Sequence, residues 1–326
     1  CSVDLTAQTP EEPRVQTVRT LAPPQIDGKL DDPVWRNAVP VERFFQRSPV
    51  EGAPSTERTV LRILHDDDRI YFGIRCFDSE PDRIIGTQMQ RDADLGSDDD
   101  VSIILDTYND RRGGFYFNTN PLGARADQLL TDEGRARNEA WDCVWSCRAT
   151  RDSEGWTVEI AIPFDQLRYA ESADAVWGIN VGRVIRRKRE DVYLVPPPLS
   201  YGFRGAYRTS KLAVLKGLGA LRTKPRLQIT PYSLTGTDRE FDGLDPTERP
   251  EFNTGLDVKY GLTPGLTLDL SYKTDFAQVE ADQEQVNLTR FSLFFPEKRD
   301  FFLEGAGIFD FGERRQTVGG GTIRPP

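Results

Sequence analysis

The feature that most constrains the fold is a succession of short β-rich segments between Leu21 and about Gly217. They are rich in β-branched and aromatic residues, and Gly, Asp, Asn or Pro bounds most of them. The segments are residues 59–66, 69–78, 100–110, 113–121, 142–152, 155–164 and 176–185. Long helical periodicity is nearly absent, and "PFDQLRY" (163–169) is at most a turn or a short helix. The pattern predicts an all-β fold, an antiparallel β-sandwich.

Composition excludes several classes of protein. No run of eighteen apolar residues occurs, so no transmembrane helix is predicted. The net charge of −10 argues against a general nucleic-acid binder. The local exception is the basic run "RVIRRKRE" (183–190), which we interpret as a solvated strand end, with a patch for anionic lipid or a partner as the alternative.

Catalytic motifs are also missing from the sequence. The chain has one histidine, His65, which cannot supply a multi-histidine metal site and which we interpret as a polar turn residue. No glycine-rich phosphate-binding motif occurs. With 52 acidic residues, a carboxylate pair of glycosidase type will arise by chance somewhere. We therefore predict a non-catalytic protein.

The cysteines suggest an anchor rather than a redox site. Cys1, followed by a polar, proline-containing stretch, resembles the start of a mature bacterial lipoprotein, in which Cys1 would carry the lipid. Cys143 and Cys147 lie too far apart along one strand to form a disulfide with each other. Cys76 could pair with one of them, or all three could be buried thiols.

Several motifs resemble carbohydrate-binding module family 9, and they occur in the right order over residues 19–217. The first is "PPQIDGKLDDPVWRNA" (23–38), and the others are "DDDVSIILDT", "NPLGARADQ", "GWTVEIAIPFDQLRY" and "WGINVGRVIRR". The resemblance implies a family-9-like sandwich at 19–218, after a tether at 1–18. It also implies sugar binding through aromatic faces and hydrogen-bonding side chains.

The tryptophans are the first candidates for such a sugar site. Trp35, Trp156 and Trp177 occupy fold-signature positions, and we expect them in the core. Trp141 and Trp145 share a strand face with Cys143 and Cys147, a face that points to the sandwich interior or to a sugar. The candidate carbohydrate-binding residues are Trp141, Trp145 and Arg183.

Acidic triplets provide the only candidate metal site. Asp98, Asp99 and Asp100 lie at a loop–strand junction, and oxygen-rich loops can bind calcium. Alternation along a strand sends neighbouring side chains to opposite faces, so the triplet is not a ready-made cage. Calcium at Asp98–Asp100 is therefore an expectation beside a purely structural role.

The segment after Gly217 resembles a bacterial family in which a family-9-like domain precedes an outer-membrane β-barrel region. The matching residues are 272–312, and two alternating strands precede them at 256–262 and 266–272. Because "GTDREFDGLDPTERPEFN" (236–253) is loop-like, we expect only a few barrel-like antiparallel strands in 219–326, too few for a closed barrel. Their open edges and the aromatic residues Phe294, Phe295, Phe301 and Phe302 would need a cover.

Together these observations predict a lipid-anchored protein on the outer, periplasmic side of a membrane in a Gram-negative-type bacterium. As the main hypothesis, it is a structural subunit that docks on a membrane protein complex through the sandwich and the C-terminal strands. The alternative is a glycan-binding module of the cell envelope.

Overall fold

The computed structural model describes residues 13–139, 141–221, 227–242, 245–263, 266–273, 317–318 and 321–322. Regular structure in these residues consists of strands and short 3₁₀ helices. No helix among them is long and apolar enough to cross a membrane. The predicted all-β fold is confirmed. Cys1 and the four phenylalanines at 294, 295, 301 and 302 lie outside the described residues.

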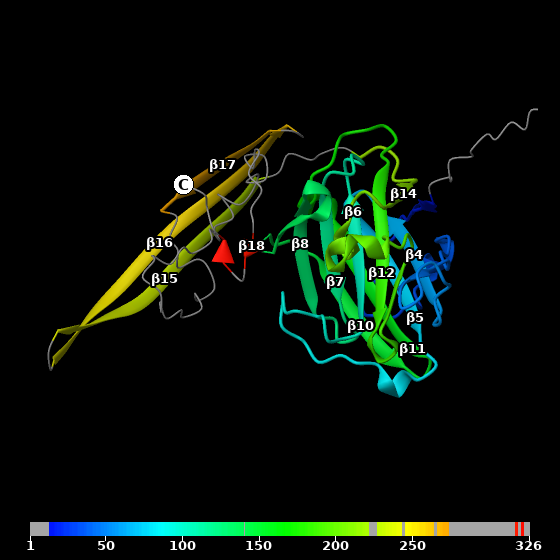
Figure 1. Ribbon diagram of the computed structural model, residues 1–326. Helices are drawn as coiled ribbons and strands as arrows, with labels where there is room; N and C mark the ends of the chain where they lie inside the picture. The colour runs from blue at the N-terminus through cyan, green and yellow to red at the C-terminus, as the bar shows by residue number, and fades with distance from the viewer. Residues whose placement is uncertain are drawn as a thin grey trace, which may run out of the picture. The chain divides into compact units, whose positions relative to one another are not determined.

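The first layer of the sandwich is a nine-stranded sheet (Figure 1). Its main path, in spatial order, is β1 (Arg14–Gln16), β14 (Ala213–Lys216), β12 (Trp177–Ile185), β6 (Asp100–Asp106), β7 (Gly114–Thr119), β8 (Arg125–Thr131) and β9 (Ala136–Asn138). Two further strands extend it beside β12, namely β13 (Glu190–Tyr193) and β3 (Phe45–Ser48). All pairs on the main path are antiparallel except β1 with β14.

The second layer is a five-stranded sheet behind the first in Figure 1. Its order is β10 (Ser146–Asp152), β11 (Gly155–Pro163), β5 (Arg69–Phe77), β4 (Thr59–His65) and β2 (Val18–Arg19). β1 belongs to the nine-stranded sheet and β2 to the five-stranded sheet, and both strands begin inside the segment predicted as a tether. The sandwich therefore starts earlier in the sequence than predicted. The segment predicted as a strand at 142–152 becomes one only at Ser146, although burial alternates from Trp141 onward.

The core lies between the two sheets, because one face of each strand is apolar. In β6, Val101, Ile103 and Leu105 point inward, and β11 contributes every second residue from Trp156 to Ile162. Full burial of one such side chain stabilises the fold by roughly 1.5–3 kcal/mol. Trp156 and Trp177 belong to this core, as predicted.

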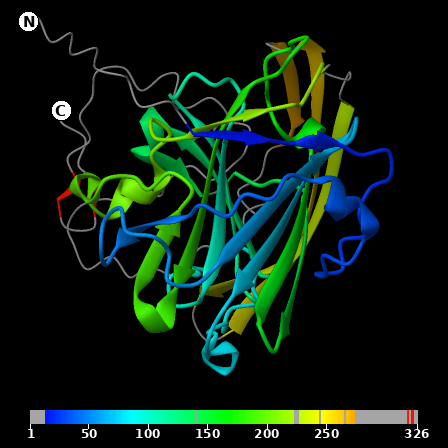
Figure 2. The same ribbon diagram turned by 90° about the vertical axis from the view of Figure 1, so that its right-hand side faces the viewer.

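Residues 20–38 cover the outer face of the five-stranded sheet, which Figure 2 shows as the blue segment that follows β2. Here Trp35, in the 3₁₀ helix η1 (Pro33–Asn37), is buried against Leu64, Tyr71 and Ala161. Gly73 makes room for the indole, because a Cβ at Gly73 would lie 3.0 Å from Trp35 Cζ3. The Ile-Asp-Gly turn (26–28) lies in this covering segment and joins no pair of strands.

Six other 3₁₀ helices interrupt the connections of the sandwich. They are η2 (Pro81–Arg83), η3 (Asp132–Gly134), η4 (Phe164–Gln166), η5 (Arg186–Lys188), η6 (Leu199–Tyr201) and η7 (Phe203–Tyr207). The helix η4 is the short element expected in "PFDQLRY".

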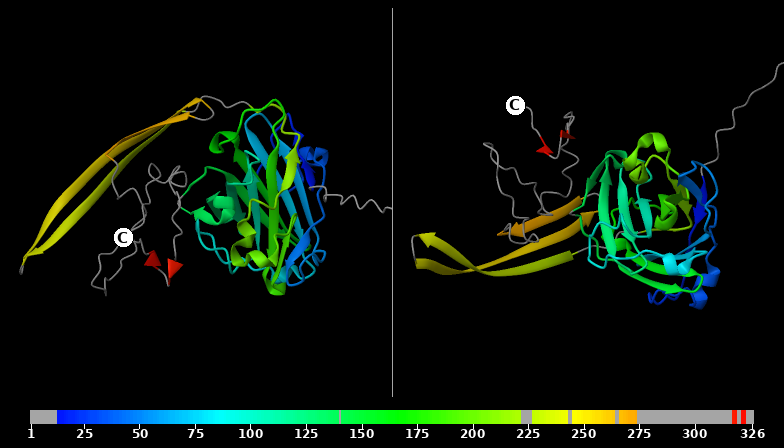
Figure 3. Two further views of the ribbon diagram at one scale, coloured as in Figure 1. Left: turned by 45° about the horizontal axis from the view of Figure 1, so that its top comes forward. Right: turned by 60° about the horizontal axis from the view of Figure 1, so that its bottom comes forward.

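The chain forms two compact units, and the second contains most of a separate three-stranded sheet. This sheet has the order β15 (Leu227–Asp242), β16 (Asp245–Thr263) and β17 (Leu266–Tyr272) (Figure 3). The predicted strands at 256–262 and 266–272 fall in β16 and β17. The expected loop at 236–253 was wrong, because β15 and β16 extend through most of it. A short pair, β18 (Thr317–Val318) and β19 (Gly321–Thr322), lies near the C-terminus.

Candidate functional site

Trp145 is part of the sandwich interior. It is 2% exposed, and its Nε1 donates a hydrogen bond to Asp127 Oδ1 (3.0 Å). Trp141 is half-buried, with its ring centroid 5.0 Å from that of Phe115. Because a buried ring presents no face to a ligand, Trp145 cannot be the sugar-binding residue that the sequence offered as a candidate.

Arg183 also points between the sheets, not to a surface. Its Nη2 donates to the carbonyl oxygen of Phe77 (2.7 Å), and its Nη1 donates to Thr59 Oγ1 (3.1 Å). The residue is 2% exposed. The structure therefore corrects its placement in a carbohydrate site: Arg183 joins the ends of strands in the two sheets.

The acidic triplet uses its oxygens within the protein. Asp98 accepts hydrogen bonds from the backbone N–H groups of Thr87 and Gln88 and from Asn120 Nδ2 (2.7 Å). Asp99 accepts from the N–H of Arg186 (3.0 Å), while Asp100 faces the opposite side of the sheet. No group of three or more His, Cys, Asp or Glu side chains among the described residues is placed to hold a metal ion. Calcium binding stays a prediction, and the contacts give Asp98 and Asp99 a structural role.

The three cysteines of the sandwich are buried thiols that form no disulfide. Burial raises the pKa of the Cys76 and Cys147 thiols to about 11. Since the thiolate is the reactive form, both groups are inert near neutral pH.

Asp127 is a buried residue of β8. Burial raises the pKa of its carboxyl to about 6, against the opposing effects of Trp145 and Arg91. Its oxygens also accept from the N–H of Cys143 (2.6 Å) and from Arg91 Nη2 (2.5 Å). The native state therefore binds this proton more tightly than the unfolded chain does, whose pKa is near 3.8. The stability that results is fully present below pH 3.8 and is lost as the pH rises towards 6.

We expect the free energy of unfolding of the wild type, relative to Asp127→Asn, to fall by roughly 2–3 kcal/mol between pH 4 and pH 7. Urea denaturation at several pH values measures this difference. Asp142→Asn is the matched control, because Asp142 also pairs with Arg91 but is 69% exposed. A difference for Asp127→Asn that does not change with pH would contradict the prediction.

Polar and aromatic side chains gather on the outer face of the nine-stranded sheet. Strand register puts Ser102 opposite Asn118 and puts Tyr116 opposite Gln128. Tyr193 lies over Gly182, where a Cβ would come within 2.5 Å of Tyr193 Cε1 and 2.8 Å of Ser102 Oγ. Tyr207, from η7, packs edge-on against Tyr116 with a centroid distance of 5.0 Å. We call these six residues the outer-face cluster: Ser102, Tyr116, Asn118, Gln128, Tyr193 and Tyr207.

The outer-face cluster holds polar atoms that the chain does not satisfy. Asn118 Oδ1 and Gln128 Oε1 are buried and accept no hydrogen bond, although both side chains belong to half-buried residues. Arg47 Nε, on the neighbouring strand β3, is also buried without an acceptor, while its Nη2 donates to the carbonyl oxygen of Gly202. A buried polar atom without a partner costs roughly 1–3 kcal/mol. Water or a ligand hydroxyl is the natural partner for such atoms.

Charge around the outer-face cluster is low. Burial raises the pKa of Asp100 well above its usual value, although Arg186 Nη2, 4.0 Å from its Oδ2, opposes the increase. Burial likewise raises the pKa values of Tyr116 and Tyr193. Arg137 lies over the ring of Tyr207 (4.4 Å to the centroid) and pairs with Glu139 (3.1 Å). The face therefore offers hydrogen-bonding groups and aromatic edges with little net charge.

Sequence reasoning missed this face. Its members come from four strands and the 3₁₀ helix η7, which are distant in the sequence, and only Ser102, Tyr116 and Asn118 lie in the β-rich segments recognised from the sequence. The available signal was in "DVSIILD", where Asp100, Ser102 and Asp106 share a strand face with the apolar Ile104, a mixture that marks an outer face that is not wholly solvated.

Fold and site together define the class: a two-sheet β-sandwich with a polar, aromatic outer face and, among the described residues, no metal-type cluster. Residues 26–185 match the family described as "Carbohydrate family 9 binding domain-like". Residues 223–314 match a "Domain of unknown function (DUF5916)". The family-9-like sandwich is thus confirmed, whereas the pairing with an outer-membrane barrel stays a prediction. No curated protein matches the chain.

Among similar solved structures, one supports the fold. A putative carbohydrate-binding protein from Bacteroides uniformis is 11% identical, with a TM-score of 0.51 over 63% of this chain and 99% of that one. A family 9 carbohydrate-binding module from Caldicellulosiruptor kristjanssonii, in complex with cellotriose, is 16% identical. Its TM-score is 0.45, over 62% of this chain and 92% of that one.

Proposed function

We propose that the sandwich is a non-catalytic carbohydrate-binding module and that the outer-face cluster binds the sugar. The observation that carries this proposal is the pair of buried, unsatisfied amide oxygens on Asn118 and Gln128, beside Tyr116. Sugar hydroxyls donate hydrogen bonds to such oxygens, and the half-buried ring of Tyr207 would supply the apolar contact that binding sites combine with a few placed polar groups. The match of residues 26–185 to a carbohydrate-binding family supports the same ligand class.

An extracytoplasmic location belongs to this proposal and rests on the sequence alone. Docking on a membrane protein complex, the main hypothesis from the sequence, stays a prediction. Its support is the set of exposed apolar side chains on β16 and β17, namely Leu256, Tyr260, Leu268, Leu270 and Tyr272. Because the carbohydrate hypothesis has both a candidate site and a family match, it is the better supported of the two.

The test is glycan binding by the intact chain, first on a glycan array and then by calorimetry with the best glycan. We expect Asn118→Ala and Gln128→Ala each to weaken binding at least about tenfold, since each removes an acceptor that the sugar would satisfy. Asn37→Ala and Gln25→Ala are matched controls, because both residues are exposed in the segment that covers the other sheet. Their affinities should equal that of the wild type.

Two results would count against the proposal. If the folded wild-type chain binds no glycan, the function is wrong. If a glycan binds equally well to Asn118→Ala and Gln128→Ala, the function stands but the site lies elsewhere. Melting temperatures of all variants separate lost binding from lost folding.

A further inference from the structure

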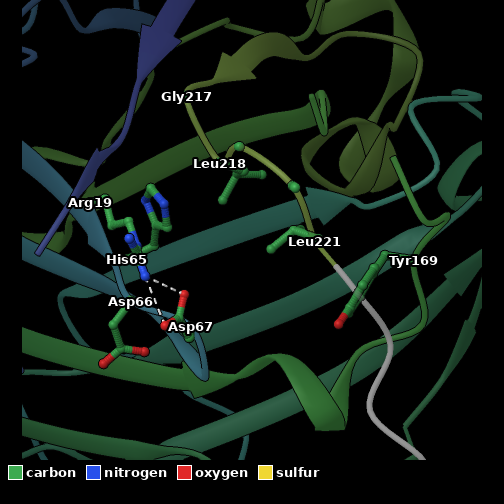
Figure 4. Close-up of a pocket in the computed structure, with 10 residues that line it drawn as sticks. Arg19, His65, Asp66, Asp67, Tyr169, Gly217, Leu218 and Leu221 are labelled. Carbon is green, nitrogen blue, oxygen red and sulfur yellow. Dashed lines mark hydrogen bonds and ion pairs between the residues drawn. The ribbon is translucent and has the colours of Figure 1, made fainter. Parts of the chain in front are cut away.

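A cavity of about 370 Å³ lies at one end of the sandwich, away from the outer-face cluster. The chain passes there from β1 in one sheet to β2 in the other, and the loop after β14 returns beside it. Six residues define its character: Arg19, His65, Asp67, Tyr169, Leu218 and Leu221 (Figure 4). The volume is at the small end of the range for ligand sites, roughly 300–1,000 Å³.

The cavity has an apolar floor and a polar rim. Tyr169, Leu218 and Leu221 belong to the main hydrophobic core, and each is at most 7% exposed. At the rim, Arg19 Nη2 contacts both carboxylate oxygens of Asp67 at 2.7 and 2.8 Å, so the two charges neutralise each other. A ligand here would meet apolar contacts on one side and hydrogen-bonding groups on the other.

His65 is the buried polar group at the border between rim and floor. It is the last residue of β4 and only 3% exposed, so the structure corrects its interpretation as an ordinary turn residue. Its Nδ1 shares a hydrogen bond with Thr17 Oγ1 (3.2 Å), and its ring lies between Arg19 and Leu218 in Figure 4. Whichever atom donates in that bond, Nε2 is left to a ligand. Burial lowers the pKa of His65, so the imidazole is neutral near pH 7.

We propose that this cavity binds a small, neutral, amphipathic molecule, namely a single aromatic ring that carries a hydroxyl group. The ring would pack against Tyr169, Leu218 and Leu221, and the hydroxyl would hydrogen-bond to His65 Nε2 at the rim. An anionic ligand is disfavoured, because Arg19 already pairs with Asp67 and the carboxylate of Asp66 also lines the cavity. This site is independent of the proposed sugar site.

The single histidine of the chain makes the test direct, because the Cε1–H proton of His65 gives a unique NMR signal. We would titrate the intact chain with p-cresol and follow that signal. A saturable shift with a midpoint of about 1 mM or tighter is expected for a ligand of this size. The charged analogue p-toluenesulfonate should produce no saturable shift.

Ala220→Trp provides the blocking variant. Ala220 lines the cavity but is exposed, so an indole there can occupy the entrance without entering the core. It should weaken p-cresol binding at least about tenfold. The matched control is Ala136→Trp, an exposed alanine on β9, at the opposite edge of the nine-stranded sheet from β1. It should bind like the wild type.

Three results would overturn the proposal: a shift that does not saturate, an equal affinity in Ala220→Trp, or a saturable shift with p-toluenesulfonate but not with p-cresol. Because Asn118→Ala and Gln128→Ala alter the other site, they should leave p-cresol binding unchanged. Failure of the cavity proposal is thereby distinguishable from failure of the sugar proposal.

Discussion

Replacing Glu159 with alanine is expected to lower the free energy of unfolding by about 3 kcal/mol. Glu159 is fully buried on β11, on the outer face of the five-stranded sheet. Its Oε1 accepts a hydrogen bond from Trp35 Nε1 (2.7 Å), and its Oε2 accepts from the N–H groups of Asp27 and Gly28, each at 2.9 Å. The carboxylate thus fastens the covering segment to the sheet. Alanine would leave the buried indole N–H and the Gly28 N–H without an acceptor.

Urea denaturation of the wild type and of Glu159→Ala measures this effect. Glu159→Gln should lie between them, because an amide keeps one acceptor oxygen but turns an NH₂ group towards N–H donors. Glu154→Ala is the surface control, since Glu154 is 72% exposed and its ion pair with Arg75 is long, at 3.4 Å. A loss below about 1 kcal/mol for Glu159→Ala would show that other contacts hold the covering segment.

Glu159 also shows where sequence reasoning ends. The alternation in "GWTVEIAIPF" correctly predicts a strand whose inner face carries Trp156, Val158 and Ile160. The same alternation places Glu159 on the other face, which looks solvated until residues 20–38 are known to cover it. Covering segments are non-local, so the period of a strand cannot reveal them.

Arg183 and the acidic triplet are two further cases in which the sequence could not show the hydrogen-bond partners of a polar residue. Arg183 lies on the same face of its strand as the core residues Ile179 and Val181, because the three occupy every second position. This alternation already indicated that Arg183 points inward. What the sequence could not show was its acceptors, which lie on β4 and β5. For Asp98, the donors come from residues 87, 88 and 120, and no spacing rule joins these positions. Strand existence was readable because it depends on neighbours in the chain, whereas the roles of polar residues depend on distant partners.

The basic run at 183–190 gives the second large effect, because the structure places Arg187 in a buried ion-pair network and not at a solvated strand end. Arg187 Nη2 contacts Asp78 Oδ1 (2.5 Å) and Glu57 Oε1 (2.7 Å), and all three side chains are at most 7% exposed. Its Nη1 contacts Glu80 Oε1 at 2.8 Å. The guanidinium therefore neutralises carboxylates that follow β5 and precede β4, and it ties both to the end of β12.

Arg187→Met is expected to destabilise the fold by roughly 3–5 kcal/mol, because it keeps the apolar stem but leaves Asp78 and Glu57 as buried charges with fewer partners. Lys188 Nζ, 2.5 Å from Glu57, and Arg183, 3.9 Å from Asp78, compensate only in part. The double variant Arg187→Met with Asp78→Asn should recover part of the loss, since it removes one of the orphaned charges. Arg83→Met is the control: Arg83 pairs with Glu80 at 2.8 Å but is 63% exposed, and its loss should cost less than about 1 kcal/mol. If Arg187→Met and Arg83→Met prove equally stable in urea, the buried network contributes no more than a surface pair, and packing alone holds this end of the sandwich.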